Sequence, residues 1–231
     1  MNTTNKIKNK INFISIEGSI GAGKSTLLQH VYLELQRRGL GEDRVYTVPE
    51  SIDEWNGVTD EGKTILQLFY QDKKKYAFAF QCLTLTTLFK NIRRVSEKHP
   101  DTIILSERSL YSNRFIFENM LYDSGDMSHI EHVIYEKMWN EYNRMMFQSI
   151  TIYVNTDVKT CVNRIIQRQR PGEGEIPLKY LNELHVRHQN LIYALRQVEN
   201  HKLVLFDGNL TVNTLGYNTR VNELVDLVTV L

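Results

Sequence analysis

Cysteine is scarce in this chain. Its 231 residues include two, Cys82 and Cys161, both in stretches with helical spacing. Two isolated thiols do not form a disulfide framework, so a reducing compartment is expected. Net charge is also small, at +1, which gives no reason to expect a nucleic acid or a membrane surface as the main partner. No apolar run approaches the roughly 20 residues that cross a bilayer.

Residues 1–10 are polar and basic, without an apolar core and without arginine. Secretory signals need the apolar core, and organellar transit sequences are rich in arginine. We therefore expect a solvated tail on a cytoplasmic protein.

What the chain does contain is a regular alternation of short apolar runs with segments of helical spacing. Uninterrupted runs rich in isoleucine and valine are typical of parallel strands buried on both faces. The predicted strands are 11–17, 44–50, 102–107, 149–155 and 202–206. The predicted helices follow the first strand up to Gly39 and cover 60–98 with a break near Asp72, 109–147 with a turn at 123–128, 157–169, 178–199 and the C-terminal end. The expected fold is α/β, a five-stranded parallel sheet with helices on both faces, and residues 1–231 form one domain because no repeat or linker divides them.

Residues 17–26, EGSIGAGKST, match the G-x-x-x-x-G-K-[ST] phosphate loop, with a predicted strand before it and a helix after it. Its glycines let N–H groups turn inward around an anion, and the next helix adds its positive end. We expect Lys24 to reach the terminal phosphates of a nucleoside triphosphate and Ser25 to supply an oxygen to Mg²⁺. The predicted nucleotide-binding residues are Gly18, Ser19, Ile20, Gly21, Ala22, Gly23, Lys24, Ser25 and Thr26. The loop alone does not separate a kinase from a GTPase, an ATPase motor or a nucleotide sensor.

Two predicted strands end in carboxylates, where the ligand crevice of a doubly wound sheet opens. Glu50 ends the second strand, with Trp55 five residues later, and Glu107-Arg108 end the third. Glu50 fits a base that accepts a hydroxyl proton, and equally a solvated loop residue. Glu107 fits a Mg²⁺ ligand acting through water, and Arg108 a group that neutralises the transferring phosphate. Both also fit a salt-bridged helix cap at Ser109.

Three arginines, Arg164, Arg168 and Arg170, come directly before a loop with two prolines and two glycines at 170–177. The first two share a helix face. Such a cluster can close over a triphosphate as a lid, here residues 164–176, and exclude water. The alternative is a basic, exposed helix end that complements the helix dipole.

Taken together, these segments resemble the cellular deoxynucleoside kinases, the family of deoxycytidine, deoxyguanosine, mitochondrial thymidine and insect multisubstrate kinases. The segments that carry the resemblance are ISIEGSIGAGKST (14–26), VPESIDEW (48–55), the Tyr70…Phe80-Gln81 spacing, SERSLYSNRFIF (106–117), RIIQRQR (164–170) and IPLKYLNELH (176–185). The resemblance runs almost end to end. It implies ATP-dependent 5′-phosphorylation of deoxynucleosides for nucleotide salvage, with Mg²⁺. It also implies a homodimer that pairs the helices around 74–98 and 129–147, although the apolar faces of these helices fit burial within one chain equally well.

The resemblance implies catalytic and sugar-binding roles as well. Glu50 matches the base that takes the 5′-hydroxyl proton, Arg108 the arginine that contacts the 5′ region, and Glu107 the carboxylate that assists Mg²⁺. Tyr70 and Glu173 match the pair that holds the sugar 3′-hydroxyl.

For the two bases, the resemblance implies a further set of contacts. Gln81 matches the amide that hydrogen-bonds the edge of the acceptor nucleobase, and Phe117 the ring that stacks on it. Trp55 and Phe80 match residues that line the same pocket. The loop that borders the adenine of the donor would contain Leu210, Thr211 and Val212.

Two positions depart from the members that prefer deoxycytidine or purines. Leu88 stands where those members carry an arginine, and Asn113 where they carry an aspartate. Losing the arginine makes room for the 5-methyl group of thymine, although Thr84 on the same helix narrows the cleft. We expect a preference for pyrimidine deoxynucleosides, thymidine among them. A purine preference is the alternative, because Asn113 can hydrogen-bond a purine or cytosine.

Two other functions would use the same phosphate loop. Thymidylate kinase has an acceptor that is already anionic, so it favours positive charge where this chain has Glu50. A regulatory P-loop protein would bind ATP without any turnover that depends on a deoxynucleoside.

Overall fold

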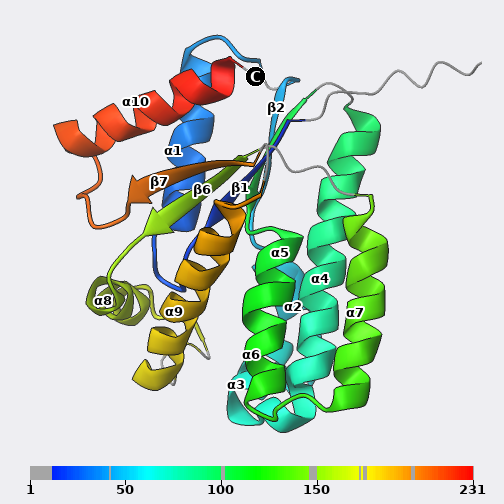
Figure 1. The fold of residues 1–231 in the computed structure, drawn as a ribbon. Helices are drawn as coiled ribbons and strands as arrows, with labels where there is room; N and C mark the ends of the chain where they lie inside the picture. The colour runs from blue at the N-terminus through cyan, green and yellow to red at the C-terminus, as the bar shows by residue number, and fades with distance from the viewer. Residues whose placement is uncertain are drawn as a thin grey trace, which may run out of the picture.

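The computed structural model describes residues 12–41, 43–99, 102–145, 150–171, 173, 176–198 and 201–230 (Figure 1). The predicted tail at 1–10 lies outside these residues. The central sheet has five strands, all parallel, in the order β2-β5-β1-β6-β7. They are β1 (Asn12–Glu17), β2 (Val45–Val48), β5 (Ile103–Glu107), β6 (Ile150–Asn155) and β7 (Lys202–Asp207). The predicted α/β fold with a five-stranded parallel sheet is therefore confirmed.

The helices cover both faces of this sheet (Figure 1). On one face, α1 (Lys24–Arg37) packs against α10 (Leu215–Thr229) over Ile14 and Ile16 of β1. On the other face, α4 (Lys73–Lys98) and α7 (His129–Asn143) cover Phe13 of the same strand. Neighbouring residues of β1 are thus buried in opposite directions, which is why the strand reads as an unbroken apolar run.

The remaining α-helices complete the fold. They are α2 (Ile52–Asn56), α3 (Ile65–Gln71), α5 (Leu110–Ser112), α6 (Asn119–Asp123), α8 (Val158–Arg168) and α9 (Leu178–Leu195). The predicted break at Asp72 is confirmed, because its side chain accepts a hydrogen bond from the backbone N–H of Lys75 and begins α4. Within the described ranges, no helix is long and apolar enough to cross a membrane.

Part of the predicted helix at 60–98 is wrong. Its first residues belong to a hairpin of β3 (Thr59–Asp60) and β4 (Lys63–Thr64). The turn between the two strands has positive φ at Glu61 and Gly62, 48° and 76°, as two-residue hairpin loops require. Thr64 then caps α3 through a reciprocal pair of hydrogen bonds with Gln67.

The predicted helix that begins at residue 109 also differs from expectation. Between α5 and α6 the chain forms a π-helix, η1 (Asn113–Glu118), wider than an α-helical turn. Such turns are rare and often occur at functional sites. Hydrophobic periodicity does not distinguish them from an ordinary helix over so few residues.

Candidate active site

A cavity of about 370 Å³ opens at the carboxyl ends of β1, β2 and β5, where ligands bind in open α/β sheets. The predicted residues that line it are Ile20, Gly21, Gly23, Lys24, Ser25, Thr26, Glu50, Trp55, Tyr70, Phe80, Gln81, Thr84, Leu88, Glu107, Arg108, Asn113, Phe117, Arg164, Arg168, Arg170 and Glu173. Gly18, Ser19 and Ala22 belong to the same loop but do not line the cavity. Leu210, Thr211 and Val212 also lie outside its lining, in the turn before α10.

The phosphate loop connects β1 to the first residue of α1, Lys24. Gly23 caps this helix with φ at +100°, a conformation that favours glycine. The Lys24 ammonium donates to the Ser19 carbonyl at 3.1 Å and lies 3.6 Å from Glu107 Oε1. A buried cation and the N-terminus of a 14-residue helix thus face the same space, which is the arrangement that binds anions.

Ser25 and Glu107 bring two oxygens together at the edge of this loop. The Ser25 hydroxyl donates to Glu107 Oε2 at 2.7 Å. Magnesium is usually held by one or two such protein oxygens together with phosphates and water. The described residues contain no group of three or more His, Cys, Asp and Glu side chains placed to hold a metal ion, so Mg²⁺ here would rely on the phosphates. The donor set fits the predicted ion.

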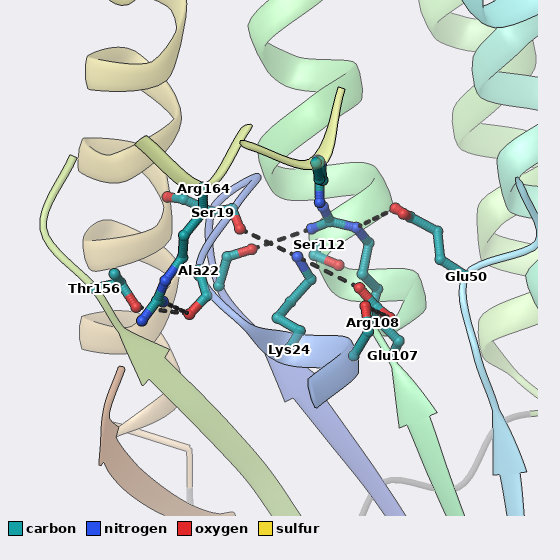
Figure 2. Close-up of polar contacts among 12 residues, drawn as sticks. Ser19, Ala22, Lys24, Glu50, Glu107, Arg108, Ser112, Thr156 and Arg164 are labelled. Atoms are coloured by element: carbon teal, nitrogen blue, oxygen red, sulfur yellow. Dashed lines mark hydrogen bonds and ion pairs between the residues drawn. The ribbon is translucent and has the colours of Figure 1, made fainter. Parts of the chain in front are cut away.

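Glu50 and Arg108 form an ion pair in the lining of the cavity (Figure 2). Arg108 Nε donates to Glu50 Oε1 at 3.1 Å, and Arg108 Nη1 donates to the Gly18 carbonyl at 3.4 Å. The guanidinium also lies 4.5 Å from the centre of the Phe117 ring. Arg108 has φ at +72°, which is uncommon for arginine, and its backbone N–H donates to Ile16. Three contacts therefore hold the guanidinium, and a fourth holds the Arg108 backbone.

These charges set the protonation of the carboxylate. Burial raises the pKa of Glu50. The nearby charges of Arg108 and Lys24 lower it by more than burial raises it, so the pKa lies below its usual value. Burial likewise lowers the pKa of Arg108, and Glu50 and Glu107 more than reverse that effect. Glu50 is therefore ionised at neutral pH, as a general base must be.

The three arginines of the predicted lid have different partners. Arg168 donates to Glu173 Oε2 at 2.6 Å, and Arg170 lies 3.1 Å from Glu173 Oε1 and 3.5 Å from Glu50 Oε2. Both side chains are a third exposed or less, unlike an exposed helix end. Residues 172, 174 and 175 of the predicted lid lie outside the described residues.

Arg164 instead binds the backbone of the phosphate loop at Ala22 (Figure 2). Its guanidinium donates to the Ala22 carbonyl at 3.0 Å and to the Gly208 carbonyl at 2.9 Å. The Thr156 hydroxyl donates to the same Ala22 carbonyl at 2.8 Å. Arg164 thus connects the nucleotide loop to the turn after β7, a role that the sequence did not indicate.

The close packing of these segments around Gly208 leaves no room for a side chain at this position, so we expect substitutions there to destabilise the protein. A Cβ on Gly208 would lie 1.9 Å from Thr156 Oγ1 and 2.7 Å from a methyl group of Val154. We expect Gly208→Ala to lower the free energy of unfolding by about 2 kcal/mol, measured by chemical denaturation. Adding Thr156→Ala should cost less in this background than alone, because it removes the nearest clashing atom.

The matched control is Gly216→Ala in α10, where the nearest atom to a new Cβ is 3.9 Å away and stability should not fall. Equal losses at both glycines would contradict the packing argument.

The other end of the cavity is aromatic. Trp55 and Phe80 meet edge to face at 5.4 Å, and Phe69 lies 4.9 Å from Phe80. The Trp55 indole N–H donates to Thr87 at 3.1 Å, so the ring is fixed in place. Gln81 lines the same cavity and is 3% exposed, and its side-chain carbonyl oxygen makes no hydrogen bond to any described residue. A buried amide oxygen without a partner in a cavity is suited to accept a hydrogen bond from a polar ligand.

Tyr70 and Glu173 also line the cavity, as predicted for a pair that binds one hydroxyl. Burial raises the pKa of Tyr70, and Tyr180 and Glu173 add to the effect, so the phenol keeps its proton. Tyr180 itself was missed, although it belongs to the quoted segment 176–185. It lines the cavity, and the Lys73 ammonium lies 4.1 Å from the centre of its ring.

Glu17 is a second residue that the prediction left out. It ends β1 directly below the site, is 1% exposed, and burial raises its pKa. The hydroxyls of Ser109 and Ser112 and the guanidinium of Arg108 lie nearby, but neither Glu17 oxygen makes a well-aligned hydrogen bond to a described residue. Its position directly before Gly18 of the phosphate loop was the sequence signal that could have identified it.

Comparison with known proteins agrees with this geometry. Residues 14–229 match the family model described as Deoxynucleoside kinase. Human deoxycytidine kinase is 33% identical over 202 residues, covering 78% of this chain and 75% of the human one. A probable deoxycytidine kinase of fowlpox virus (strain NVSL) is 34% identical over 182 residues, covering 76% and 69%. The mitochondrial deoxyguanosine kinase of Xenopus laevis is 28% identical over 211 residues, covering 81% and 77%. The chain therefore belongs to the deoxynucleoside kinase family and is a phosphotransferase that acts on deoxynucleosides.

Proposed function

We propose that the protein transfers the terminal phosphoryl group of ATP to the 5′-hydroxyl of pyrimidine deoxynucleosides, thymidine among them. The observation that carries this proposal is the ionised Glu50 carboxylate facing Arg108 and the Lys24 loop across one cavity. A carboxylate so placed can take the proton of an alcohol but would repel an acceptor that is already a phosphate. This argues against thymidylate kinase as the activity.

In this mechanism, Glu50 accepts the 5′-hydroxyl proton as the oxygen forms a bond to the terminal phosphorus. The bond from that phosphorus to the bridging oxygen breaks, and ADP leaves. Lys24 and Arg108 stabilise the charge that spreads over the phosphoryl oxygens. Ser25 and Glu107 would hold Mg²⁺, which when bound offsets phosphate charge. Arg168, which pairs with Glu173 in this structure, would contact the same phosphates as part of the lid.

The acceptor would lie in the aromatic end of the cavity. Gln81 has an unpaired buried oxygen and would hydrogen-bond the edge of the base, with Phe117 stacked on it. Tyr70 and Glu173 would bind the 3′-hydroxyl. We propose that the donor adenine lies against the turn that contains Leu210, Thr211 and Val212. The support is that Arg164 joins this turn to the phosphate loop through Gly208.

Base preference rests on Leu88 and Asn113, which both line the cavity. An apolar side chain at Leu88 leaves room for the 5-methyl group of thymine and supplies no charged partner for amino-substituted bases. We expect kcat/KM to be higher for thymidine than for deoxyadenosine or deoxyguanosine in a panel that also includes deoxycytidine. Leu88→Arg should lower kcat/KM for thymidine by about 10–100-fold, because it fills that space.

The relatives described above are deoxycytidine and deoxyguanosine kinases, so the panel decides between their bases and thymine for this chain. A purine deoxynucleoside with much the highest kcat/KM would contradict the argument from Leu88 and support the alternative that Asn113 reads a purine. Thymidine monophosphate serves as the control acceptor, because a thymidylate kinase would phosphorylate it and leave thymidine untouched. ATP binding without deoxynucleoside-dependent turnover would indicate a regulatory protein.

We also propose a homodimer built from α4 and α7. Its support is that α7 leaves Ile130 and Ile134 exposed, at 70% and 43%, beside its contact with α4. Sedimentation equilibrium tests it, with Ile130→Glu expected to weaken association. A cytoplasmic location is proposed because Cys82 and Cys161 are both free thiols, and imaging of the tagged protein tests it.

A further inference from the structure

The π-helix η1 has two faces with different roles. Asn113 and Phe117, four residues apart, line the cavity. Arg114 and Glu118, also four residues apart, form an ion pair at 2.7 Å. One short, wide turn therefore carries two proposed base contacts and, beside them, a pair of charges that the proposed chemistry does not use.

These charges belong to a network that joins η1 to α7. Glu118 is fully buried, and its Oε1 lies 2.7 Å from Nδ1 of His132. Arg114 pairs with Glu136, one turn further along the same helix. Tyr122 stacks on the His132 ring with the ring centres 4.0 Å apart. Two residues of the π-helix are thus held by two residues of α7.

Stability alone does not account for a buried network of this kind. Taking a carboxylate out of water is costly, and here burial raises the pKa of Glu118 even though His132 and Arg114 oppose the effect. Apolar side chains of similar size would often be as stable in its place. An ion pair adds geometric specificity, because its directional hydrogen bonds fix one orientation of the turn that carries it.

That orientation matters on the other side of the turn. Phe117 lies against the Arg108 guanidinium as well as the cavity, so a rotation of η1 would move both the proposed stacking ring and the support of Arg108. A displacement of about 1 Å in a positioning group can cost roughly 100-fold in rate.

We propose that the network of Arg114, Glu118, His132 and Glu136 is a positioning device that anchors the π-helix to α7 so that Asn113 and Phe117 face the acceptor base. The four residues act through the turn and touch no substrate. The inference rests on the proposed function, since it assigns the acceptor to this end of the cavity.

Two substitutions of His132 test it in the full-length protein. His132→Asn keeps a donor near the position of Nδ1 and can still bind Glu118, whereas His132→Leu removes it. We expect His132→Leu to raise KM for the preferred deoxynucleoside about 10-fold with KM for ATP within about 2-fold, and His132→Asn to restore most of the loss. Both variants lose the stack on Tyr122, so the difference between them reports the hydrogen bond alone.

A double variant separates position from stability. Arg114→Met with Glu118→Leu replaces the buried ion pair by apolar groups and should melt closer to the wild type than Glu118→Leu alone, which leaves Arg114 without its partner on η1. Its KM for the deoxynucleoside should nevertheless stay raised about 10-fold. The control is Glu97→Leu, which breaks the exposed pair with Arg93 on α4. It should change neither the melting temperature nor KM for the deoxynucleoside.

The proposal is overturned if His132→Leu and His132→Asn share the same KM for the nucleoside, or if KM for ATP rises by the same factor. It is also overturned if the double variant has wild-type kinetics, because the network would then be structural only. A wild-type protein that phosphorylates no deoxynucleoside overturns the proposed function itself, which separates that failure from a failure of the network argument.

Discussion

Glu50→Gln is expected to lower kcat about 1,000-fold while changing the affinity for ATP by less than about 3-fold. Glutamine keeps the size of the side chain and its hydrogen bond from Arg108, which is 3.1 Å in the structure, but it cannot accept a proton. The measurement is steady-state turnover of the preferred deoxynucleoside together with nucleotide binding by calorimetry. The loss should therefore appear in the chemical step and not in binding.

The matched control is Glu54→Gln on α2, four residues along the chain. Glu54 pairs with Lys90, and that pair is partly exposed and lies outside the cavity lining. Its substitution should leave kcat unchanged. If Glu50→Gln lowered kcat by less than 10-fold, Glu50 would not be the general base.

The pH profile gives a related expectation for the wild type. Because burial, which raises the pKa of Glu50, is outweighed by Arg108 and Lys24, the folded pKa lies below 4.5 and the base is ionised at every pH above that value. Activity that depends on Glu50 is present above its folded pKa and is lost as pH falls through it. We therefore expect kcat to show no acid limb from Glu50 between pH 8 and about pH 5.5. An inflection near pH 6.5 that disappears in Glu50→Gln would contradict this.

Arg108→Lys is expected to lower kcat/KM for the deoxynucleoside by about 100–1,000-fold, although the charge is kept. Lysine presents a single ammonium, whereas Arg108 donates to Glu50 and to the Gly18 carbonyl at once and lays its planar face on Phe117. One point charge cannot make these three contacts from a backbone held at φ +72°. Steady-state kinetics with the nucleoside varied at saturating ATP measures the effect.

Arg93→Lys is the control, since Arg93 makes only an exposed pair with Glu97 among the described residues, and its substitution should have no effect. If Arg108→Lys kept more than a tenth of wild-type kcat/KM, the geometry of the guanidinium would not matter and only its charge would.

Strands, sheet and phosphate loop could be predicted because each leaves a local signal. An unbroken apolar run such as that of β1 indicates a strand buried on both faces. The motif EGSIGAGKST indicates a phosphate loop, and such a loop joins a strand to a helix. The hairpin at Thr59–Thr64 was missed, although Asp60-Glu61-Gly62 is a turn signal, because the strands on either side have only two residues each. Strands that short have no readable alternation.

Side-chain partners in the site were predictable only in part. That Glu50 and Arg108 lie near each other follows from both ending parallel strands on one edge of the sheet. That Arg164 turns to Ala22 while Arg168 turns to Glu173 does not follow, because residues four apart on a helix share a face but choose partners by tertiary packing. The π-helix at Asn113–Glu118 packs against α4, α7 and α9, which are distant in sequence, and its own six residues give no signal that distinguishes it from an α-helix.

Arg170 lies near one oxygen of the proposed base and one of the residue expected to hold the sugar. Any alcohol that approaches Glu50 must compete with this resident cation, and so must a stray water molecule. A nucleoside carries two hydroxyls, so one can hydrogen-bond Glu173 while the other approaches Glu50. A water molecule can engage only one of the two carboxylates at a time. We therefore expect the Arg170 contacts with Glu50 and Glu173 to favour an entrant that can engage both carboxylates over a single water molecule, which would limit hydrolysis of the triphosphate without an acceptor.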